Sequence, residues 1–482
     1  MKMVEAYKAQ FIDFLLERGV LTIGGPYQLK SGRLSPYFLK LDSVNDGEGL
    51  NALGDSYAET ILAHLGPGMF DGVVGIPSKC HTFGPAISTS LSRRGANKPY
   101  SSWREKPKTY GDATALGSVG KEQRQNEMVL GAHIPNGSRQ VLIDDVMTAG
   151  DAKEGALKML EFLAEDIVVP ALVIAANRQE IDKRGENAVE QFTRQHNIPI
   201  HYPITASDIF DHLKETNRIS SDDERAFMNY LRAWGTPDVR ERYGLRNSHF
   251  VEGRCVIPAC DIGDIERFEQ IVIETADVPG IGGYKIGFEL GLLHALPHVV
   301  EVVRTHAPNK KIVYDHQKAG TDIPDTGLNF ARTMKRSGVD AAIVFPQAGP
   351  VTQVRWIGEL LQQGVGVFVG GEMTHEGYKA SDGGYIADEA LERMYRLGAN
   401  MGVVNFIVPG NKTDRIQVYR ELIRELGVDP AFGAPGFVAQ GGKISDAARV
   451  AGDNWYAIVG RDIMNAKDVR AKAQELTSQL AA

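Results

Sequence analysis

The chain has 482 residues, of which 43% are hydrophobic and 24% are charged, and its formal net charge is −8. This length is too great for one hydrophobic core, so we expect two domains. The composition is typical of a globular protein, and the negative charge argues against a broad nucleic-acid-binding surface. The cysteines, Cys80, Cys255 and Cys260, are scattered and form neither a disulfide framework nor a four-ligand zinc site.

No stretch of the sequence is both apolar and long enough to span a membrane. The first twenty residues mix acidic and basic side chains with apolar ones in the pattern of an amphipathic helix, which a signal peptide does not show. We therefore expect a cytoplasmic protein that has no membrane partner.

The most specific motif of the first half lies at residues 141–152. An apolar strand ends in Asp144 and Asp145, a short loop containing Thr148 follows, and a helical pattern begins at Lys153. Backbone amides at a helix N-terminus bind phosphate, and the two acids suit the hydroxyls of a ribose. The motif resembles the signature of phosphoribosyltransferases that use phosphoribosyl pyrophosphate (PRPP). The alternative is an ordinary strand end with a solvated acid pair.

Other segments of the first half suit the same kind of ligand. Residues 29–38 combine two cations, two serines and two aromatic residues, which fits a flat anion, although a turn with core aromatics has the same composition. A buried strand at 72–76 leads to Lys79. The charged segment 103–112 reads as a mobile lid or as a solvated charge run. A further strand, Ala171–Ala176, delivers Arg178 at its C-terminal end.

In this order the segments resemble the orotate phosphoribosyltransferase family over roughly the first 210 residues. The resemblance implies a type I phosphoribosyltransferase fold with an open parallel sheet, and a dimer in which the lid lysine reaches the neighbouring site. It implies that Mg²⁺ is held mainly by PRPP, with no firm protein ligand. The implied contacts are Lys30, Phe38 and Arg178 for orotate, Lys79, Arg104 and Lys108 for pyrophosphate, Asp144 and Asp145 for ribose, and Thr148, Ala149, Gly150, Asp151 and Ala152 for the 5′-phosphate.

Three residues depart from the pattern common in that family: Glu105 and Tyr110 in the lid, and Asn177 before the arginine. The first two replace a cation and a histidine, so we predict that Lys108 is the catalytic residue of the lid. In the implied reaction the orotate nitrogen attacks the anomeric carbon while pyrophosphate leaves, and the cations stabilise the growing negative charge.

Residues 213–250 are mostly polar and have a helical period, with a helix start near Ser221 and a break at Gly235-Thr236-Pro237. We interpret this segment as a helical linker. The predicted domains are therefore 1–212, the linker 213–250, and a second catalytic domain at 251–482.

The second half alternates short apolar segments with amphipathic helices. Eight such units in this length predict a (β/α)₈ barrel. The predicted strands are Cys255–Cys260, Tyr284–Gly287, Lys311–Tyr314, Ala341–Phe345, Gly366–Gly370, Gly402–Ile407, Gly436–Ala439 and Tyr456–Val459. Charged residues that follow the strands are expected at the C-terminal face, where such barrels place their active sites.

These strand ends resemble the orotidine 5′-monophosphate (OMP) decarboxylase family over nearly the whole second half. The resemblance implies a cofactor-free decarboxylase with a shared dimeric site. The implied catalytic residues are Lys285, Asp315, Lys318 and Asp322, with Asp322 and Thr326 entering the neighbouring subunit. The implied substrate contacts are Asp261 at the ribose, Thr374 at the pyrimidine, and Gln440, Gly441, Gly442, Gly460 and Arg461 at the phosphate.

In the decarboxylase family, one residue commonly separates the first acid of the charged cluster from the lysine. In this chain two residues separate Asp315 from Lys318. On a regular strand these side chains would point to opposite faces. We therefore predict that the strand ends or bulges near Asp315, with His316 as the alternative candidate for that position.

Because the product of the first predicted site is the substrate of the second, the chain resembles the bifunctional UMP synthase family, with orotate, PRPP and OMP as its small-molecule substrates. Two alternatives remain at this stage. The barrel resembles metal-dependent sugar-phosphate decarboxylases and synthases of the same superfamily, and the first half resembles PRPP-sensing regulators that do not catalyse a reaction.

Overall fold

The computed structural model describes residues 4–106, 120–147, 151–317, 322–437 and 441–481. The chain forms two compact units, one of residues 1–182 and 186–228, the other of residues 183–185 and 229–482. The division falls within a helix of the segment that we interpreted as a linker. No helix among the described residues has the length and hydropathy needed to cross a membrane.

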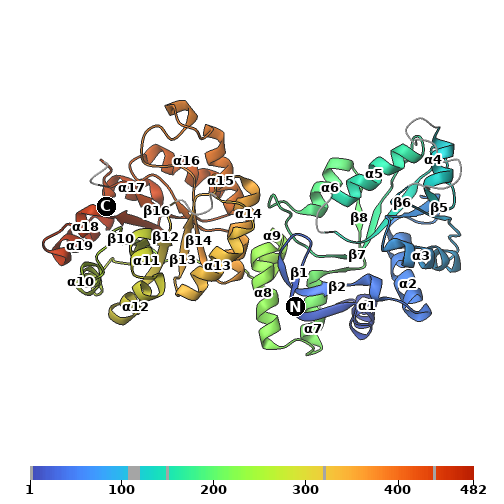
Figure 1. The fold of residues 1–482 in the computed structure, drawn as a ribbon, viewed down its shortest axis with the longest axis horizontal. Coiled ribbons are helices and arrows are strands. Elements are labelled where there is room, and N and C mark those ends of the chain that lie inside the picture. Colours follow the sequence, from blue (N-terminus) through green and yellow to red (C-terminus); the bar gives the residue numbers. More distant parts are fainter. Residues whose placement is uncertain (1–3, 107–119, 148–150, 318–321, 438–440, 482) are drawn as a thin grey trace. The chain divides into compact units, whose positions relative to one another are not determined.

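The first unit is built on a twisted sheet with the strand order β5-β4-β3-β6-β7-β8, and β9 pairs with β7 (Figure 1). A separate antiparallel pair precedes this sheet. The strands are β1 (Leu21–Gln28), β2 (Leu34–Leu39), β3 (Gly72–Gly75), β4 (Tyr100–Trp103), β5 (Val129–Gly131), β6 (Gln140–Val146), β7 (Leu172–Asn177), β8 (Ile200–His201) and β9 (Ile204–Thr205).

Successive residues of a strand point to opposite faces, and those of β3, β6 and β7 are nearly all buried. Helices therefore cover both faces of this sheet. Val74 and Leu142 pack towards α5, whereas α2 and α3 lie against the other face (Figure 1). The helices are α1 (Ala6–Glu17), α2 (Gly47–His64), α3 (Cys80–Arg93), α4 (Lys121–Met128), α5 (Asp151–Leu163), α6 (Ala188–His196), α7 (Ala206–Glu215) and α8 (Ser221–Trp234).

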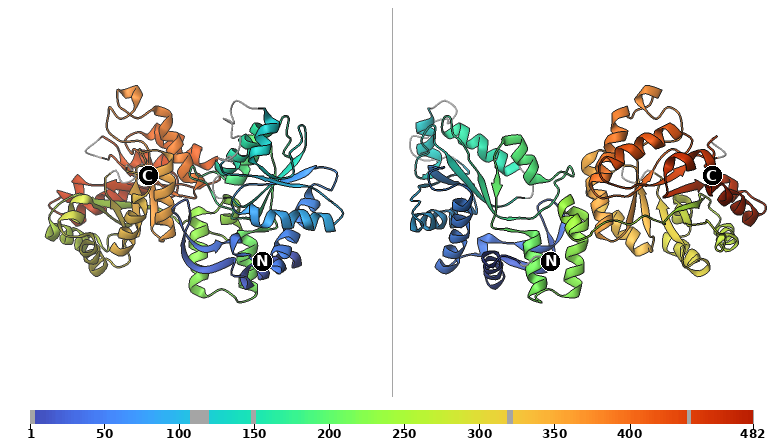
Figure 2. Two further views of the ribbon diagram at one scale, coloured as in Figure 1. Left: turned by 45° about the vertical axis from the view of Figure 1, so that its right-hand side comes forward. Right: turned by 180° about the vertical axis from the view of Figure 1, so that it is seen from behind.

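The second unit is a closed barrel of eight parallel strands, as predicted. Helices surround the strands in both views of Figure 2. The strands are β10 (Arg254–Cys260), β11 (Gly283–Gly287), β12 (Lys311–Asp315), β13 (Ala341–Val344), β14 (Gly366–Gly370), β15 (Asn405–Ile407), β16 (Ala431–Pro435) and β17 (Trp455–Val459). The helices are α9 (Pro237–Arg242), α10 (Ile265–Thr275), α11 (Phe288–Leu293), α12 (Leu296–His306), α13 (Thr326–Ser337), α14 (Pro350–Gln362), α15 (Asp388–Asn400), α16 (Thr413–Arg424), α17 (Ile444–Ala451), α18 (Arg461–Met464) and α19 (Val469–Ser478).

Two predictions about strands need correction. The seventh barrel strand is Ala431–Pro435, so the prediction of Gly436–Ala439 was wrong. Small residues and a proline occupy the true strand, and they suggest a turn when only the sequence is considered. The first sheet is mixed rather than wholly parallel, because β5 pairs antiparallel with β4 at its edge. The edge strand β5 therefore runs back along its neighbour β4.

Residues 246–251, here called the plug segment, precede β10 and close the N-terminal mouth of the barrel. Phe250 enters the barrel core and packs edge-on against Phe368, with a centroid distance of 5.2 Å. Its backbone N–H donates to Asn405 Oδ1 at 2.8 Å, and Tyr456 OH donates to the carbonyl of Val251 at 2.7 Å. The strands themselves therefore provide the side chains that fix this plug.

Candidate active sites

The predicted acid pair lies at the C-terminal end of β6, in the middle of the first sheet. Both carboxylates are buried, and each pairs with a different lysine. Lys153 Nζ lies 2.7 Å from Asp144 Oδ2 and also donates to the Val146 carbonyl at 2.7 Å. Lys79 pairs with Asp145. Burial raises the pKa of Asp144, whereas for Asp145 the Lys79 ammonium outweighs burial and lowers the pKa.

Lys79 follows a strained turn after β3. Ser78, immediately before it, has φ of 81°, a left-handed conformation that residues other than glycine rarely adopt. Such strain is concentrated at functional sites, where the surrounding structure maintains it. On the neighbouring strand end, Arg104 Nε is buried and has no hydrogen-bond partner among the described residues. A buried guanidinium nitrogen with no partner suits an anionic ligand.

Arg178, predicted to contact the substrate ring, lies just beyond β7. Its Nη2 donates to Ser35 Oγ at 2.9 Å, and its Nε donates to Glu180 Oε1 at 2.8 Å. The guanidinium lies 4.1 Å from the centroid of the Tyr37 ring. Arg33 adds a second connection by donating to the carbonyl of Ile181 at 2.7 Å. These contacts bring the segment 29–38 to the end of β7, although the sequence separates them by some 140 residues.

Further predicted residues of this unit lie in the β1–β2 pair and at the start of α5. Lys30 is exposed in the turn between β1 and β2, and Phe38 is half-buried with its ring 5.9 Å from that of Tyr27. Asp151 and Ala152 begin α5, but their side chains are not described. Four predicted residues lie outside the described ranges: Lys108, Thr148, Ala149 and Gly150.

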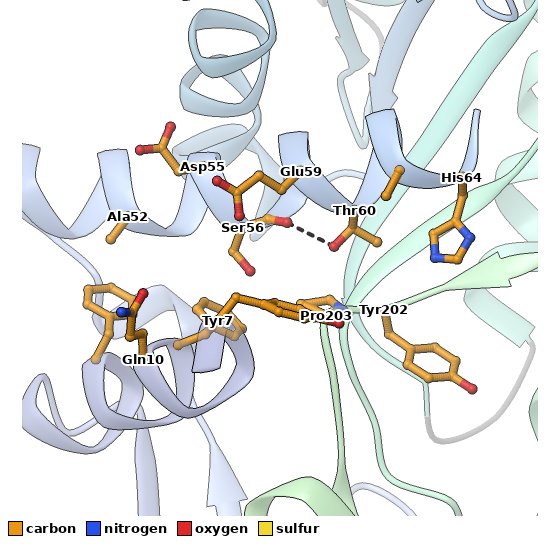
Figure 3. Close-up of a pocket in the computed structure, with 13 residues that line it drawn as sticks. Tyr7, Gln10, Ala52, Asp55, Ser56, Glu59, Thr60, His64, Tyr202 and Pro203 are labelled. Carbon is orange, nitrogen blue, oxygen red and sulfur yellow. Dashed lines mark hydrogen bonds between the residues drawn. The ribbon is translucent and has the colours of Figure 1, made fainter. Parts of the chain in front are cut away.

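The first unit also contains a cavity of about 600 Å³ between α1 and α2. Figure 3 shows Tyr7 and Gln10 on α1 facing Ser56 on α2, with Tyr202 at one side. None of the residues that line it is among the predicted site residues, so we assign it no part in catalysis.

In the barrel, Lys285 lies at the centre of a charged cluster at the C-terminal ends of three adjacent strands. Its Nζ lies 2.8 Å from Asp261 Oδ1 and 3.0 Å from Asp315 Oδ2. Burial alone would lower the pKa of Lys285, but the two carboxylates outweigh it and raise the pKa. The structure therefore brings together three of the predicted residues, one immediately after β10, one within β11 and one at the end of β12.

The predicted irregularity near Asp315 is present. β12 ends at Asp315, and Gln317 has φ of 50°. The carboxylate of Asp315 lies on the same strand face as Val313, which belongs to the barrel core. His316 instead forms a 2.7 Å hydrogen bond through Nδ1 with Tyr314 OH, on the opposite face. This geometry favours Asp315 over His316 as the first acid of the cluster.

The remaining predicted barrel residues are distributed around the same face. Asp322 is exposed, and its backbone carbonyl accepts a hydrogen bond from Thr352 Oγ1 at 3.0 Å. Thr326 begins α13, and the carbonyl of Thr374 accepts from Asn411 Nδ2 at 3.2 Å. Lys318 and Gln440 lie outside the described residues.

The predicted phosphate contacts lie after β16 and β17. A Cβ atom at Gly442 would lie 2.6 Å from the carbonyl oxygen of Gly436, so position 442, next to Gly441, requires glycine. Gly460 precedes α18, and the exposed Arg461 has no carboxylate partner within the described ranges.

The ionic partners of two buried residues were not predictable from the sequence. The pattern at Lys153 indicated only the start of a helix, although this residue binds Asp144. Glu372, after β14, is fully buried, and its carboxylate lies 3.0 Å from Lys412 Nζ and 3.1 Å from Arg415 Nε. Tyr419 OH also donates to it, at 2.5 Å. The position of Glu372 at a strand end was the available signal, but nothing in the sequence indicated its partners.

These folds and sites define a two-domain α/β enzyme, with a phosphoribosyltransferase-type sheet followed by a decarboxylase-type barrel. The first half is 32% identical over 219 residues to the orotate phosphoribosyltransferase of Haemophilus influenzae Rd, an alignment that covers 45% of this chain and 93% of the relative. The corresponding protein of Thiobacillus denitrificans is 29% identical over 231 residues, covering 48% of this chain and 98% of the relative. The chain therefore belongs, through its first half, to the orotate phosphoribosyltransferase family.

The second half matches a different family. Residues 255–476 match the model of the Orotidine 5′-phosphate decarboxylase / HUMPS family. Among solved structures, the orotate phosphoribosyltransferase of Francisella tularensis shares 28% identity and has a TM-score of 0.39, covering 47% of this chain and all (100%) of that one. The orotidine 5′-monophosphate decarboxylase of Methanocaldococcus jannaschii shares 22% identity and has a TM-score of 0.42, covering 48% of this chain and 100% of that one.

Proposed function

We propose that the chain catalyses two consecutive steps of pyrimidine nucleotide synthesis. The first unit converts orotate and PRPP to OMP and pyrophosphate, and the barrel converts OMP to UMP and CO₂. The observation that carries this proposal is the presence in one chain of the lysine-paired acids at the end of β6 and the Asp261–Lys285–Asp315 cluster in the barrel. The product of one reaction is the substrate of the other.

In the first site, Asp144 and Asp145 hold the ribose hydroxyls, and Lys79 with Arg104 contacts the pyrophosphate. Lys79 must then exchange Asp145 for a phosphate oxygen, a change that its partly exposed ammonium allows. Arg178, fixed by Ser35 and Glu180, binds the orotate ring and its carboxylate. Lys108, in the lid, stabilises the leaving pyrophosphate, either by donating a proton to it or through the positive charge of its ammonium group.

A Mg²⁺ ion at this site would be held mainly by PRPP, with no firm protein ligand. Its preferred ligands are hard oxygens, which the pyrophosphate group supplies, and both nearby carboxylates are already paired with lysines. Bound Mg²⁺ would neutralise charge on the leaving group. Lys79 and Arg104 contribute to the same stabilisation from the protein side.

In the barrel, Lys285 keeps Asp261 and Asp315 ionised and fixed. Asp261 holds the ribose. Asp315, together with an Asp322 contributed by a second copy of the chain, lies beside the carboxylate that is lost. Lys318 stabilises the carbanion left on the ring and protonates it. Thr374 contacts the pyrimidine, while the loop of Gln440, Gly441 and Gly442 binds the phosphate together with Gly460 and Arg461. No cofactor is needed, because the charged groups alone stabilise the transition state.

An apolar surface at the C-terminal face of the barrel supports a shared dimeric site. Large apolar side chains are exposed there on three consecutive βα connections. They are Phe288, Leu292 and Leu293 on α11, Ile323 after β12, and Val351 on α14. Several large apolar side chains exposed on neighbouring connections are typical of an interaction site. Burial of this face against a second copy would place Asp322 and Thr326 near the partner's site.

One assay tests the proposed function. The purified protein is incubated with orotate, PRPP and Mg²⁺, and the nucleotides are separated by chromatography. UMP is the expected product, and OMP supplied directly should still be decarboxylated after a metal chelator is added. Absence of any nucleotide would refute the transferase assignment. Decarboxylation that stops on chelation would favour a metal-dependent enzyme of the same barrel superfamily.

A further inference from the structure

We propose that the N-terminal mouth of the barrel holds a second, non-catalytic site for a small phosphate-bearing ligand. A cavity of about 590 Å³, here called the basal cavity, lies between the plug segment and the strand starts. Its size falls within the range of small-molecule sites, which is roughly 300–1,000 Å³. The charged and titratable side chains that line it are Arg232, Arg246, His249, Lys311, Lys335 and Asp340.

The basal cavity is separate from the catalytic cluster. Lys311 is the first residue of β12, whereas Asp315, in the cluster, is the last residue of the same strand. At about 3.3 Å per residue the two positions lie on the order of 13 Å apart along the strand. Gly366 and Asn405, which also line the cavity, are likewise the first residues of their strands. A ligand in the basal cavity therefore cannot reach the atoms that react.

The charge of the basal cavity is positive, against a whole-chain net charge of −8. Arginine and lysine side chains reach it from α8, from the plug segment, from β12 and from α13. Asp340 is the one carboxylate among the lining residues, and it is already engaged by Arg304 at 2.8 Å and by the backbone N–H of Ile312 at 2.7 Å. It also lies 3.8 Å from Lys311 Nζ. The acid therefore neutralises only part of the local charge.

Two of the cations have no anionic partner. Neither Arg246 nor Lys335 pairs with a carboxylate in the part of the chain that the structure describes. Arg232 Nη1 donates to a neutral acceptor, Asn229 Oδ1, at 2.8 Å. Guanidinium and ammonium groups that line one cavity match the oxygens of a phosphate group. They would hold a carboxylate less well, because it offers fewer acceptor oxygens and less charge.

The other walls of the basal cavity are apolar, which suits the organic part of a small ligand better than bulk water. Val339, Val365, Val367 and Val403 are buried and line the cavity. The nearby amide of Asn405 is already committed to the backbone of the plug, so polar contacts to the ligand come mainly from the cations. The shared chemistry is thus a phosphate group, supplied either by free pyrophosphate or by a nucleotide such as UMP.

Lysine footprinting on the full chain tests this proposal locally. The rates at which an acylating reagent modifies Lys311 and Lys335 are measured by peptide mass spectrometry, with and without pyrophosphate or UMP. We expect at least threefold slower labelling of both lysines with one of these probes, and no change at the exposed Lys467. Protection by pyrophosphate alone identifies a free phosphate anion as the ligand, and protection by UMP alone identifies a nucleotide. Protection by neither probe overturns the proposal.

Variants separate the basal cavity from the active sites. Arg246→Ala should raise about tenfold the probe concentration that gives half-maximal protection. This is the size of effect expected for the loss of one charged hydrogen bond. Arg336→Ala, at the exposed position next to Lys335 on α13, serves as the matched control and should leave the protection unchanged. The double variant Lys79→Ala/Arg461→Ala removes phosphate contacts of both proposed active sites and should retain it. Protection lost in this double variant, or retained in Arg246→Ala, contradicts the proposal even if both proposed activities are confirmed.

Discussion

Lys285 is the residue on which the barrel's charged cluster depends. Replacing it by methionine leaves Asp261 and Asp315 without their shared cation, so the carboxylates repel each other and shift. We expect the rate of OMP decarboxylation by Lys285→Met to fall by about 100-fold or more. The transferase rate should be unchanged, because that site lies in the other unit. UMP formation from OMP measures the first effect, and OMP formation from orotate measures the second. Equal decarboxylation rates of the variant and the parent protein would contradict the catalytic role of Lys285.

Lys153 has a different importance, because it neutralises a buried carboxylate. In Lys153→Met, Asp144 loses its partner, and its pKa, already raised by burial, should rise further. Breaking a buried ion pair from one side typically costs about 3 kcal/mol of stability. Urea unfolding followed by a first-unit probe should show this loss, together with a higher KM for PRPP. Lys158→Met, an exposed change on the same helix, is the control and should show neither effect.

The buried carboxylate of Glu372 should make the stability of the barrel depend on pH. Although burial alone would raise its pKa, hydrogen bonds from Tyr419, Lys412 and Arg415 lower it below the ordinary value of 4.5. A carboxyl group whose folded pKa is lowered stabilises the protein fully above its unfolded pKa, and this contribution is lost as the pH falls through the folded pKa. The barrel should therefore lose stability below about pH 4.5, the ordinary value of this group. Glu372→Gln should be less stable at pH 7 and show a smaller decrease below pH 4.5, as measured by thermal unfolding across pH; identical profiles would disprove this role.

At the residue scale, the sequence singled out the acids and two of their three lysine partners, Lys79 and Lys285. Asp144, Asp145 and Asp315 were recognised from local motifs, since each follows an apolar strand. Lys153 was not, because a lysine in the first turn of a helix has the same local pattern whether it faces solvent or a buried acid. Its role depends on the packing of α5 against the end of β6, which is a tertiary property.

Among the elements, the barrel strands were predictable to the extent that apolar β-branched residues fill them. The seventh strand, Ala431–Pro435, has two alanines, a glycine and a proline, so the apolar residues after it were mistaken for the strand. At β12 the unusual spacing after Asp315 did predict the strand end, because the period of a strand forbids the alternative. The antiparallel edge strand β5 was not predicted, because the direction of a short strand is set by its partner.

The plug segment is an element that tertiary contacts define. Phe250 closes the barrel mouth and packs against Phe368 and Tyr456. Truncation to alanine should leave a cavity at the strand starts and destabilise the barrel by about 3 kcal/mol. Thermal unfolding measures this loss, and Tyr385→Ala, at a fully exposed aromatic residue of the barrel unit, is the control. A Phe250→Ala barrel as stable as the parent would mean that the mouth is closed by the hydrogen bonds alone.

For the molecule as a whole, the order of its two folds was the most predictable property. The PRPP motif and the eight-unit alternation are each long patterns, and their errors at single boundaries do not change the fold class. The division within α8 was harder to predict, since one continuous helix shows no break in its sequence period. Each unit has its own core and its own charged site, so the two activities should be separable by single substitutions.

This separability gives a prediction for the whole protein. Lys79→Ala should fail to make OMP from orotate but still decarboxylate added OMP, whereas Lys285→Met should accumulate OMP from orotate and PRPP. Mixed together, the two variants should again form UMP, because OMP released by one protein can diffuse to the barrel of the other. Chromatography of the three reactions over time measures this. If both variants lack both activities, the substitutions act through the fold. If the mixture yields no UMP, and OMP only in amounts up to that of the Lys285→Met protein, OMP stays bound to the protein that made it and does not reach the solvent.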